Sequence, residues 1–398
     1  MVNDKMSKRP GRYLLGVIYL GFFSLGLPDG TLGVAWPAMH TGLGIPVGMA
    51  GPLLLWVTLL AAGSSVASGV IGRRFAVGPV ATVSCAMTGV GLLVISQAQG
   101  LGWLVAAAVP LGLGAGAVDA GLNGFVARQY EARHMNWLHA FWGVGATSGP
   151  LVIASCLSGA EGWRWGYVII AVVQLSLVGL FAATLGWWSG APKSPKVVDD
   201  EVGRSGGELR WGPNSEAGIL SAGIFAIYVG VEITVGLWIA THLVELRGAS
   251  LAVAGFVATG YFGSITLGRI LVGLVAGRWG NRRVMGGGVM LAVVGAVLFL
   301  VADSVSGASL GVILMGWGFA PIYPGHMYEA PNRFAPEAVQ TVIGRQTASS
   351  YIGGAALPAI SGWLVQEWSV SSVPWIALGG TVLLGLVIWR VNRLTARK

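Results

Sequence analysis

Three carboxylic acids each stand alone within a long apolar stretch of this chain. They are Asp29 in GLPDGTLGVAWP, Asp119 in GLGAGAVDAGLNGF and Glu232 in YVGVEITVG. A charged side chain at the centre of a bilayer costs about 2.5–3.5 kcal/mol even on the lenient insertion scale, so such an acid must be neutral, paired or in a watery cavity. An acid that is exposed in turn to the two sides of a membrane can carry a proton across it. We therefore predict that Asp29, Asp119 and Glu232 couple proton movement to transport.

Two of these acids also have a purely structural interpretation. Asp119 and Asn123 are four residues apart on one helix face, and they could simply hydrogen-bond a neighbouring helix. Asp29 follows Pro28 and lies in a glycine-rich stretch, which predicts a kinked helix whose freed backbone carbonyls face a cavity. The carboxyl group of Asp29 could then serve only to satisfy the broken helix.

The third acid has a possible counter-ion. Glu232 occupies a position in the seventh apolar stretch that corresponds to Asp29 in the first, which favours a role in the same cavity. It could instead pair with Arg269 or Arg345, the two arginines that lie inside apolar stretches. Both arginines lie toward the expected cytoplasmic ends of their spans, where snorkelling or a gate salt bridge competes with ligand contact.

Aromatic rings are the other candidates for substrate contact. The chain has 17 tryptophans, most of which should be interfacial anchors or core residues. A minority should line the cavity, because flat rings stack on sugar faces or on aromatic drugs. We predict that the substrate is bound by Asp29, Trp36, Asp119, Asn123, His139, Trp142, Glu232, Trp238 and Tyr323. For the aromatic members of this set, plain packing is the alternative.

The histidines do not indicate an enzyme. His139 could relay protons or could pack as a satisfied core residue. His242 and His326 lie on other spans, and no ligands at metal spacing or nucleophile–base pair accompany them, so we expect neither catalysis nor a cofactor. Near His326, Glu329 and Arg333 are spaced i, i+4, which predicts a local ion pair.

The composition is typical of a polytopic membrane protein. Of 398 residues, 54% are hydrophobic and 10% charged, and the mean hydropathy is +0.72. The 64 glycines predict close helix packing. The apolar runs predict an all-α fold with twelve transmembrane helices, near 12–39, 48–71, 78–98, 101–127, 135–157, 165–188, 217–243, 251–276, 284–302, 308–329, 339–362 and 372–390. We expect the first to be retained rather than cleaved as a signal peptide.

One long polar segment divides the twelve runs into six and six. Residues 189–216 are rich in Pro, Gly, Ser and mixed charge, which is typical of a linker. We therefore predict an N-terminal six-helix half over 1–188, a cytoplasmic linker over 189–216 and a C-terminal six-helix half over 217–398. Parallel halves of this kind place a substrate site at their interface, near the bilayer midplane.

The net charge of +8 does not indicate a nucleic-acid partner. If both termini are cytoplasmic, twenty lysines and arginines fall on the inside, whereas only Arg164 and Arg247 fall outside. This bias predicts a multi-pass protein of the plasma or inner membrane with both termini in the cytoplasm. Cys85 and Cys156 lie in apolar stretches and are expected to be small packing residues. A glycine-rich run around Asp119 has no preceding strand, so it is not a dinucleotide site.

A resemblance to a known family covers the whole chain. The stretch GSITLGRILVGLVAGRWGNRR resembles the eighth span and following loop of the major facilitator superfamily. Its G-x-x-x-x-R-x-G-x-R-R ending is formed by Gly273, Arg278, Gly280, Arg282 and Arg283. The resemblance implies two pseudo-symmetric six-helix halves. At the position where the family usually has an acidic residue before the first arginine, this chain has Gly277.

Within that superfamily, four stretches are similar to the fucose/glucose/galactose proton symporters, the fucose permease-like group. They are GLPDGTLGVAWP, VDAGLNGF, LHAFWGVGATSGP and YVGVEITVGLWIATHL. The resemblance implies that Asp29 and Asp119 stand where that group has two acids for proton coupling and sugar binding, and that Asn123 matches an asparagine one turn below. His139 and Trp142 stand where the group has two amides.

Two functions follow as alternatives. We expect a monomeric, proton-coupled secondary active transporter that works by alternating access, with a monosaccharide or similar small polar solute as its substrate. The second function is proton-driven export of amphipathic drugs, which the many aromatic residues and the missing amides favour. The partners expected are protons, the small-molecule substrate and the lipid bilayer.

Overall fold

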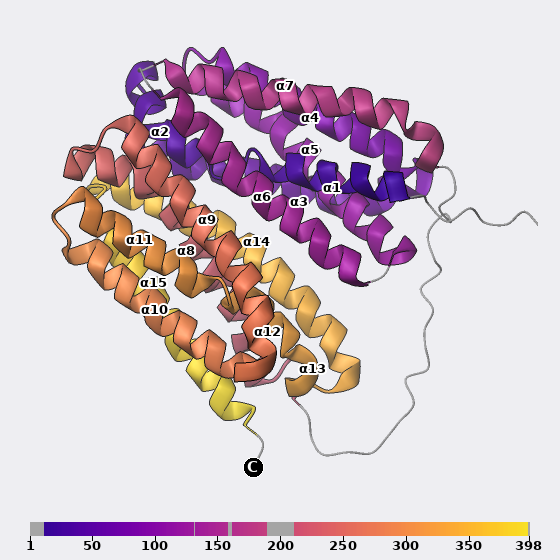
Figure 1. Ribbon diagram of the computed structural model, residues 1–398, viewed down its shortest axis with the longest axis vertical. Helices are drawn as coiled ribbons and strands as arrows, with labels where there is room; N and C mark the ends of the chain where they lie inside the picture. Colours follow the sequence, from indigo (N-terminus) through magenta and orange to yellow (C-terminus); the bar gives the residue numbers. More distant parts are fainter. Residues whose placement is uncertain (1–11, 131, 158–160, 189–210, 397–398) are drawn as a thin grey trace, which may run out of the picture. The chain divides into compact units, whose positions relative to one another are not determined.

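The computed structural model describes residues 12–130, 132–157, 161–188 and 211–396 (Figure 1). These residues are almost entirely helical, and an isolated bridge pairs Trp211 with Phe334. Ten helices of the described part are long and apolar enough to cross a membrane. Two further long helices, α6 (Ala132–Cys156) and α14 (Pro336–Glu367), are richer in polar residues and fall outside that ten. The prediction of an all-α polytopic membrane protein is confirmed.

The chain divides into two compact units, which are described separately. The first comprises Met1–Thr31 and Trp56–Asp199, and the second Leu32–Leu55 and Asp200–Lys398. The second unit thus includes a segment from the early part of the chain. Of the predicted linker 189–216, residues 189–210 lie outside the described residues. The division of the chain into halves 1–188 and 217–398 stays a prediction.

The first unit is a bundle of long helices. It holds α1 (Arg12–Gly26), most of α3 (Ala50–Arg74), α4 (Val77–Ser96), α5 (Leu101–Gln129), α6, α7 (Gly162–Ala183) and the 3-10 turn η2 (Leu185–Trp188). In it, α4 packs against α5 and α7, while α1 packs against α6 (Figure 1). The pairing of α1 with α6 matters most here, because it brings two predicted site residues together.

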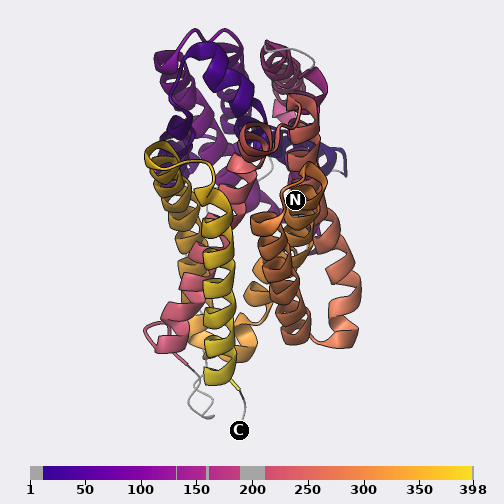
Figure 2. The same ribbon diagram turned by 90° about the vertical axis from the view of Figure 1, so that its left-hand side faces the viewer.

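The second unit is built around α8 (Glu216–Arg247). Its other elements are α2 (Thr31–Leu43), η1 (Val47–Met49), α9 (Leu251–Trp279), α10 (Asn281–Val301), α11 (Val305–Phe319), α12 (Ile322–Tyr328), α13 (Ala330–Arg333), α14 and α15 (Ser372–Leu394). The helices α9, α14 and α15 all pack against α8, and α15, drawn in yellow, can be followed along its length in Figure 2. A residue in the middle of α8 is therefore surrounded by protein on several sides.

The first predicted span is interrupted at its glycine-rich centre. Helix α1 ends at Gly26, α2 begins at Thr31, and Gly30 takes a left-handed φ of 72° that a side chain would strain. The amide of Asp29 donates to the carbonyl of Gly26 at 3.0 Å, so the acid lies in the turn itself. The kink predicted at this position is confirmed, and it is a full break between two helices.

The tenth predicted span, 308–329, corresponds to a candidate membrane span over Val305–Tyr328, and the structure breaks it into two helices. Helix α11 ends at Phe319 and the short α12 starts at Ile322. Pro321 stands between them, and proline lacks the N–H that would continue the helical hydrogen bonds. The break lets α12 leave the direction of α11 and carry Tyr323 and His326 toward α8, with which both make ring or hydrogen-bond contacts.

Glycines allow the helices to approach closely, as the composition predicts. A Cβ at Gly26 would meet the backbone of Trp142, and one at Gly145 would meet the carbonyl of Phe23. These two contacts hold α1 directly against α6. In the second unit, Gly353 of α14 touches the backbone of Ala226 in α8 in the same way.

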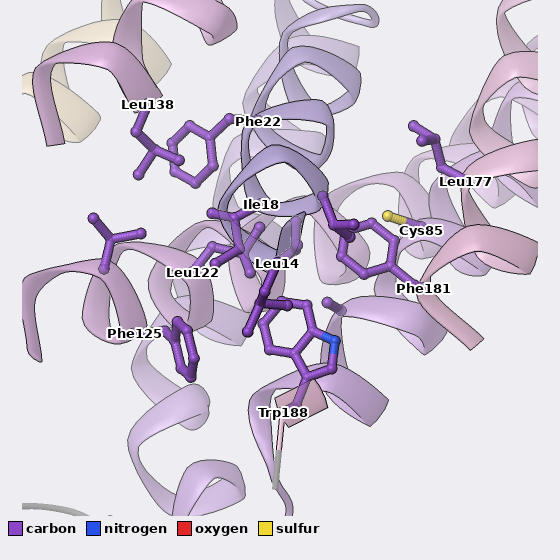
Figure 3. Packing of buried hydrophobic residues seen from close by; sticks show 14 residues of the cluster. Leu14, Ile18, Phe22, Cys85, Leu122, Phe125, Leu138, Leu177, Phe181 and Trp188 are labelled. Carbon is purple, nitrogen blue, oxygen red and sulfur yellow. The ribbon is translucent and has the colours of Figure 1, made fainter. Parts of the chain in front are cut away.

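Bulky apolar side chains fill the space beside these close contacts. In the first unit, Figure 3 shows Ile18 and Phe22 of α1 in one cluster with Phe125 of α5, Phe181 of α7 and Trp188. Their exposed fractions are close to zero. Cys85 belongs to the same cluster, as expected of a packing residue. This cluster holds the helices from which the first group of site residues projects.

Candidate functional site

The first unit holds a pair of hydrogen-bonded acids. The indole N–H of Trp142, on α6, donates to Oδ2 of Asp29 at 2.9 Å. On α5, the amide of Asn123 donates to Oδ1 of Asp119 at 2.9 Å. The two carboxyl groups lie within the range of a Coulomb interaction with each other. Four residues that the sequence predicts to act together are thus brought into one group, which we call the Asp29–Asp119 cluster.

Each acid in this cluster accepts its hydrogen bond from a neutral donor. A carboxyl oxygen can accept from an indole or an amide N–H both when the group is ionised and when it is protonated. The bond between Asp119 and Asn123 is within one helix, as their spacing of four residues implies. Both of these hydrogen bonds can therefore persist whether the carboxyl group is ionised or protonated.

His139 lies beside this cluster on α6. Its ring is exposed and meets Phe22 edge-on at 5.7 Å between centroids. Five residues before His139 on α6, Nδ1 of His134 lies 2.8 Å from the hydroxyl of Tyr19, and Tyr19 also stacks on Phe141 at 5.0 Å. The polar group of Tyr19 and His134 is not anticipated from the sequence, because neither residue lies within a motif.

The second unit holds a separate group around Glu232. Oε2 of Glu232, on α8, is 3.7 Å from a terminal nitrogen of Arg269, on α9. The same nitrogen donates to the hydroxyl of Tyr228 at 3.1 Å, and the hydroxyl of Tyr261 donates to the backbone carbonyl of Glu232 at 3.1 Å. We call these residues, with Tyr323, the Glu232–Arg269 cluster. Tyr228 and Tyr261 are not anticipated from the sequence, although Tyr228 stands four residues before Glu232.

Of the two arginines that could pair with Glu232, the structure selects Arg269. Arg345 instead donates to the carbonyl of Pro213 at 2.7 Å and to Oδ1 of Asn214 at 2.9 Å. These partners lie just before α8 begins, far along the helix from Glu232. The sequence leaves this choice open because it does not show which way α9 and α14 turn their side chains.

The three aromatic candidates of the second unit differ in exposure. Trp36 and Trp238 are fully buried, and their indole N–H groups donate to the carbonyl of Val47 at 2.7 Å and to Oγ of Ser361 at 2.8 Å. Packing accounts for both, and ligand contact stays a prediction. Tyr323 is partly exposed and has ring contacts with Phe225 at 4.7 Å and Tyr228 at 6.1 Å.

A third charged group lies near the start of α10. The carboxylate of Glu329 is 2.9 Å from Nε of Arg282 and 3.7 Å from Nε of Arg333, which confirms the predicted i, i+4 ion pair. Burial alone would raise the pKa of Glu329, but the hydrogen bond from Arg282 and the charges of both arginines outweigh it and lower that pKa. Burial and the neighbouring Arg282 lower the pKa of Arg333 to about 10. Two cations therefore share one anion here.

Each unit thus holds ionisable side chains among long apolar helices, an arrangement typical of multi-pass membrane transporters rather than of enzymes. The chain belongs to the Major Facilitator Superfamily, whose family model matches residues 18–214 and 220–398. Among the described residues, no group of three or more His, Cys, Asp and Glu side chains could hold a metal ion.

The individual relatives are distant. Bypass of stop codon protein 6 of Saccharomyces cerevisiae is 21% identical over 297 residues, which are 67% of this chain and 59% of the relative. Methyl viologen resistance protein SmvA of Salmonella typhimurium is 29% identical over 173 residues, 41% of this chain and 34% of SmvA. The matches to these curated relatives thus span about a third to three-fifths of the relatives' own length.

Two solved structures have a similar fold. The nucleoside transporter NupG matches with a TM-score of 0.71 at 15% identity, covering 98% of this chain and 100% of NupG. A D-xylose-proton symporter matches with a TM-score of 0.73 at 14% identity, covering 95% of this chain and 97% of the symporter. Identities this low establish the fold alone.

Proposed function

We propose that this protein is a proton-coupled secondary active transporter that works by alternating access and carries a monosaccharide or a similar small polar solute by symport. The observation that carries the proposal is the Asp29–Asp119 cluster. Two carboxyl groups within Coulomb range, each held by a neutral N–H donor, can exchange a proton without losing their hydrogen bonds. A transporter that couples to protons needs such a group.

The sequence motifs support a sugar as the substrate. The stretches around Asp29, Asp119 and Trp142 resemble those of the fucose permease-like proton symporters, and the turn that bears Asp29 is the break between α1 and α2. A broken membrane helix frees backbone carbonyls that can bind a polar solute. We propose further that the Asp29–Asp119 and Glu232–Arg269 clusters serve the same transport cycle.

Drug export is the second candidate. It is favoured by the match of 173 residues to SmvA, a protein named for methyl viologen resistance. Acids inside a membrane can also attract an organic cation such as methyl viologen. The many aromatic residues of this chain suit flat cations as well as sugar rings.

Proton movement in proteoliposomes decides between the two. The purified protein is placed in vesicles that contain a pH-sensitive dye, and neutral monosaccharides are added outside without any imposed proton gradient. In parallel vesicles a proton gradient is imposed, and the accumulation of methyl viologen is followed. Symport predicts that a monosaccharide acidifies the vesicle interior as it enters, whereas drug export predicts that a proton gradient drives methyl viologen against its own gradient. A monosaccharide that enters with no proton signal would contradict the coupling proposed here.

A further inference from the structure

The Glu232–Arg269 cluster lies deep in the bundle rather than at its end. At about 1.5 Å per residue, Glu232 is about 24 Å from the first residue of α8 and about 22 Å from the last. Arg269 is about 15 Å from the end of α9 at Trp279, yet its guanidinium reaches Glu232 and Tyr228. An arginine that snorkels would extend toward the helix end and the headgroups. Arg269 is directed to the middle of the span instead.

The guanidinium of Arg269 has more donors than the contacts it makes. An arginine carries five N–H donors in a planar fork that fits a carboxylate with two parallel hydrogen bonds. Here one terminal nitrogen donates to Tyr228, and the buried Nε has no hydrogen-bond partner. The 3.7 Å between Arg269 and Glu232 is an ion-pair distance, but it exceeds the normal length of a hydrogen bond. The guanidinium group of Arg269 is thus charged and partly buried, and its N–H donors do not form close hydrogen bonds with the carboxylate of Glu232.

An unsatisfied donor of this kind is costly. Leaving a buried donor without a partner costs about 1–3 kcal/mol, and more for a charged group. In the same unit, Arg282 makes a direct hydrogen bond to Glu329 at 2.9 Å, whereas Arg333 lies 3.7 Å from Glu329 and donates to Asn392 instead. The buried Nε of Arg269 has no such second partner and remains a donor that a further carboxylate can use.

Aromatic side chains stand next to this fork. The ring of Tyr228 is 5.7 Å from Phe319 and 6.1 Å from Tyr323, and Tyr323 packs edge-on against Phe225 at 4.7 Å. Tyrosine presents a flat apolar face together with a hydroxyl group, and this combination suits a sugar ring. Tyr323 is partly exposed, so the side of the Glu232–Arg269 cluster that this ring forms is not wholly covered by protein.

Among the described residues, the ionisable groups around Glu232 include Tyr228 on α8, Tyr261 and Arg269 on α9, and Tyr323 on α12. Helices α14 and α15 approach the same section of α8 with Gly353, Leu357 and Gly380. Arg269 is the cation that forms an ion pair with Glu232 in this part of the chain.

We propose that Arg269 binds an anionic group of the substrate, and that the substrate class is a monosaccharide that carries a carboxylate, such as a uronic acid. This inference rests on the proposed transport function and narrows its substrate. The carboxylate of the substrate takes the guanidinium fork, and Glu232, which thereby loses its counter-ion, accepts one proton. One negative charge and one proton enter together, so the number of net charges buried in the cluster does not change. Release of the substrate returns the proton and restores the pair.

A charge series of sugars tests this inference on the intact protein. Glucose, glucosamine and glucuronate differ chiefly in charge, and galactose, galactosamine and galacturonate form a second such series. Binding to the purified protein in nanodiscs is measured by thermal shift and by isothermal titration. We expect a uronate to bind at least about 10-fold more tightly than its neutral and cationic counterparts. Equal or tighter binding of the neutral or cationic sugar, or no binding of either uronate, would overturn the inference.

Substitutions of Arg269 test whether this residue causes the preference for the uronate. Arg269→Gln should abolish the preference for the uronate, and Arg269→Lys, which keeps the charge but loses the fork, should retain only part of it. Arg345→Gln is the matched control, because Arg345 bonds to Pro213 and Asn214, and it should leave the preference unchanged. A preference that survives in Arg269→Gln contradicts the assignment, and the wild-type charge series tests it even if that variant does not fold.

The proposed function and this inference fail in different ways. If a neutral monosaccharide binds best and still acidifies the vesicles as it enters, proton symport stands and the anionic substrate class is wrong. If no sugar of either series binds and methyl viologen is accumulated, both the sugar symport and the inference are wrong.

Discussion

At the scale of single residues, the two acids of the first unit and the acid of the second have different environments. Asp29 and Asp119 accept hydrogen bonds from the neutral donors Trp142 and Asn123, whereas Glu232 faces the cation Arg269. A neutral donor tolerates both protonation states of a carboxyl group, but a nearby cation favours the ionised state. This difference supports the proposal that the first two acids exchange protons and that Glu232 responds to the partner of Arg269.

Trp142 provides a prediction at this scale, because it combines a ring with the hydrogen bond to Asp29. If it contacts the ligand, Trp142→Ala should weaken binding by about 1–3 kcal/mol. Trp142→Phe keeps most of the ring and loses the N–H, so it should lose about 0.5–1.5 kcal/mol. Isothermal titration with the best-binding sugar measures both changes.

The matched control is Trp165→Ala, which removes a ring on α7 that is 68% exposed. Its affinity for the sugar should equal that of the wild type. Unchanged affinity in a folded Trp142→Ala variant would remove Trp142 from the substrate site.

At the scale of elements, the group around Glu329 joins α10, α12, α13 and α15 of the second unit. Arg282 lies at the start of α10, Glu329 between α12 and α13, and Arg333 at the end of α13. Arg333 is 3% exposed, and it also donates to Oδ1 of Asn392, on α15, at 2.7 Å. Removing the one carboxylate leaves two arginines without their shared partner, and one of them is buried.

Glu329→Gln should therefore destabilise the protein by about 3 kcal/mol at neutral pH. The pKa of Glu329 is lowered in the folded protein, so its contribution to stability is present above its ordinary pKa of 4.5 and is lost as the pH falls through the lower folded value. The difference in melting temperature between wild type and variant should be largest near pH 7 and shrink below about pH 4.5.

Glu216→Gln is the control for this prediction. Glu216 also pairs with an arginine, Arg390, at 2.8 Å, but both side chains are nearly half exposed. An exposed pair contributes about 0–1 kcal/mol, so this variant should change the melting temperature little. Equal effects of the two substitutions would show that the Glu329 group does not hold the helices together.

The elements also show what could be predicted from the sequence and what could not. The helices follow from apolar stretches long enough to span a bilayer, and the break at Gly26–Gly30 follows from residues that disfavour a helix. The break at Pro321 does not follow from the sequence, because membrane helices often tolerate proline. Which arginine meets Glu232 could not be derived, because it depends on the rotation of α9 about its axis.

At the scale of the whole molecule, the distribution of basic residues predicts the orientation in the membrane. Asn332, beside the buried Arg333, should lie on the cytoplasmic side, and Ser250, which follows Arg247, should lie outside. Both positions are exposed. In a protein whose Cys85 and Cys156 are replaced by serine, a membrane-impermeant thiol reagent should label Ser250→Cys in intact cells and Asn332→Cys only after permeabilisation. The reverse pattern would invert the proposed topology.

At the same scale, the proposed transport cycle uses the Asp29–Asp119 cluster to exchange protons. One substitution distinguishes a proton-coupling role of Asp119 from a purely structural role. Asp119→Asn keeps the size and most hydrogen-bonding capacity of the side chain but cannot take up a proton. If Asp119 couples protons, the variant should bind substrate and exchange it down a gradient, yet fail to accumulate it against one. If Asp119 only joins helices, an amide replaces it at a cost near 0.6 kcal/mol, and active uptake persists.

Asp29→Asn has to be measured beside it, because the two carboxyl groups are within Coulomb range and can share a proton. Either single variant could then keep partial coupling, while the double variant should keep none. Counterflow of labelled sugar reports the binding and exchange steps, and uptake driven by an imposed proton gradient reports coupling. Full proton-driven accumulation in both single variants and in the double variant would exclude the cluster from the coupling mechanism, whereas loss of accumulation with intact counterflow would establish that its titration, rather than its hydrogen bonds, drives transport.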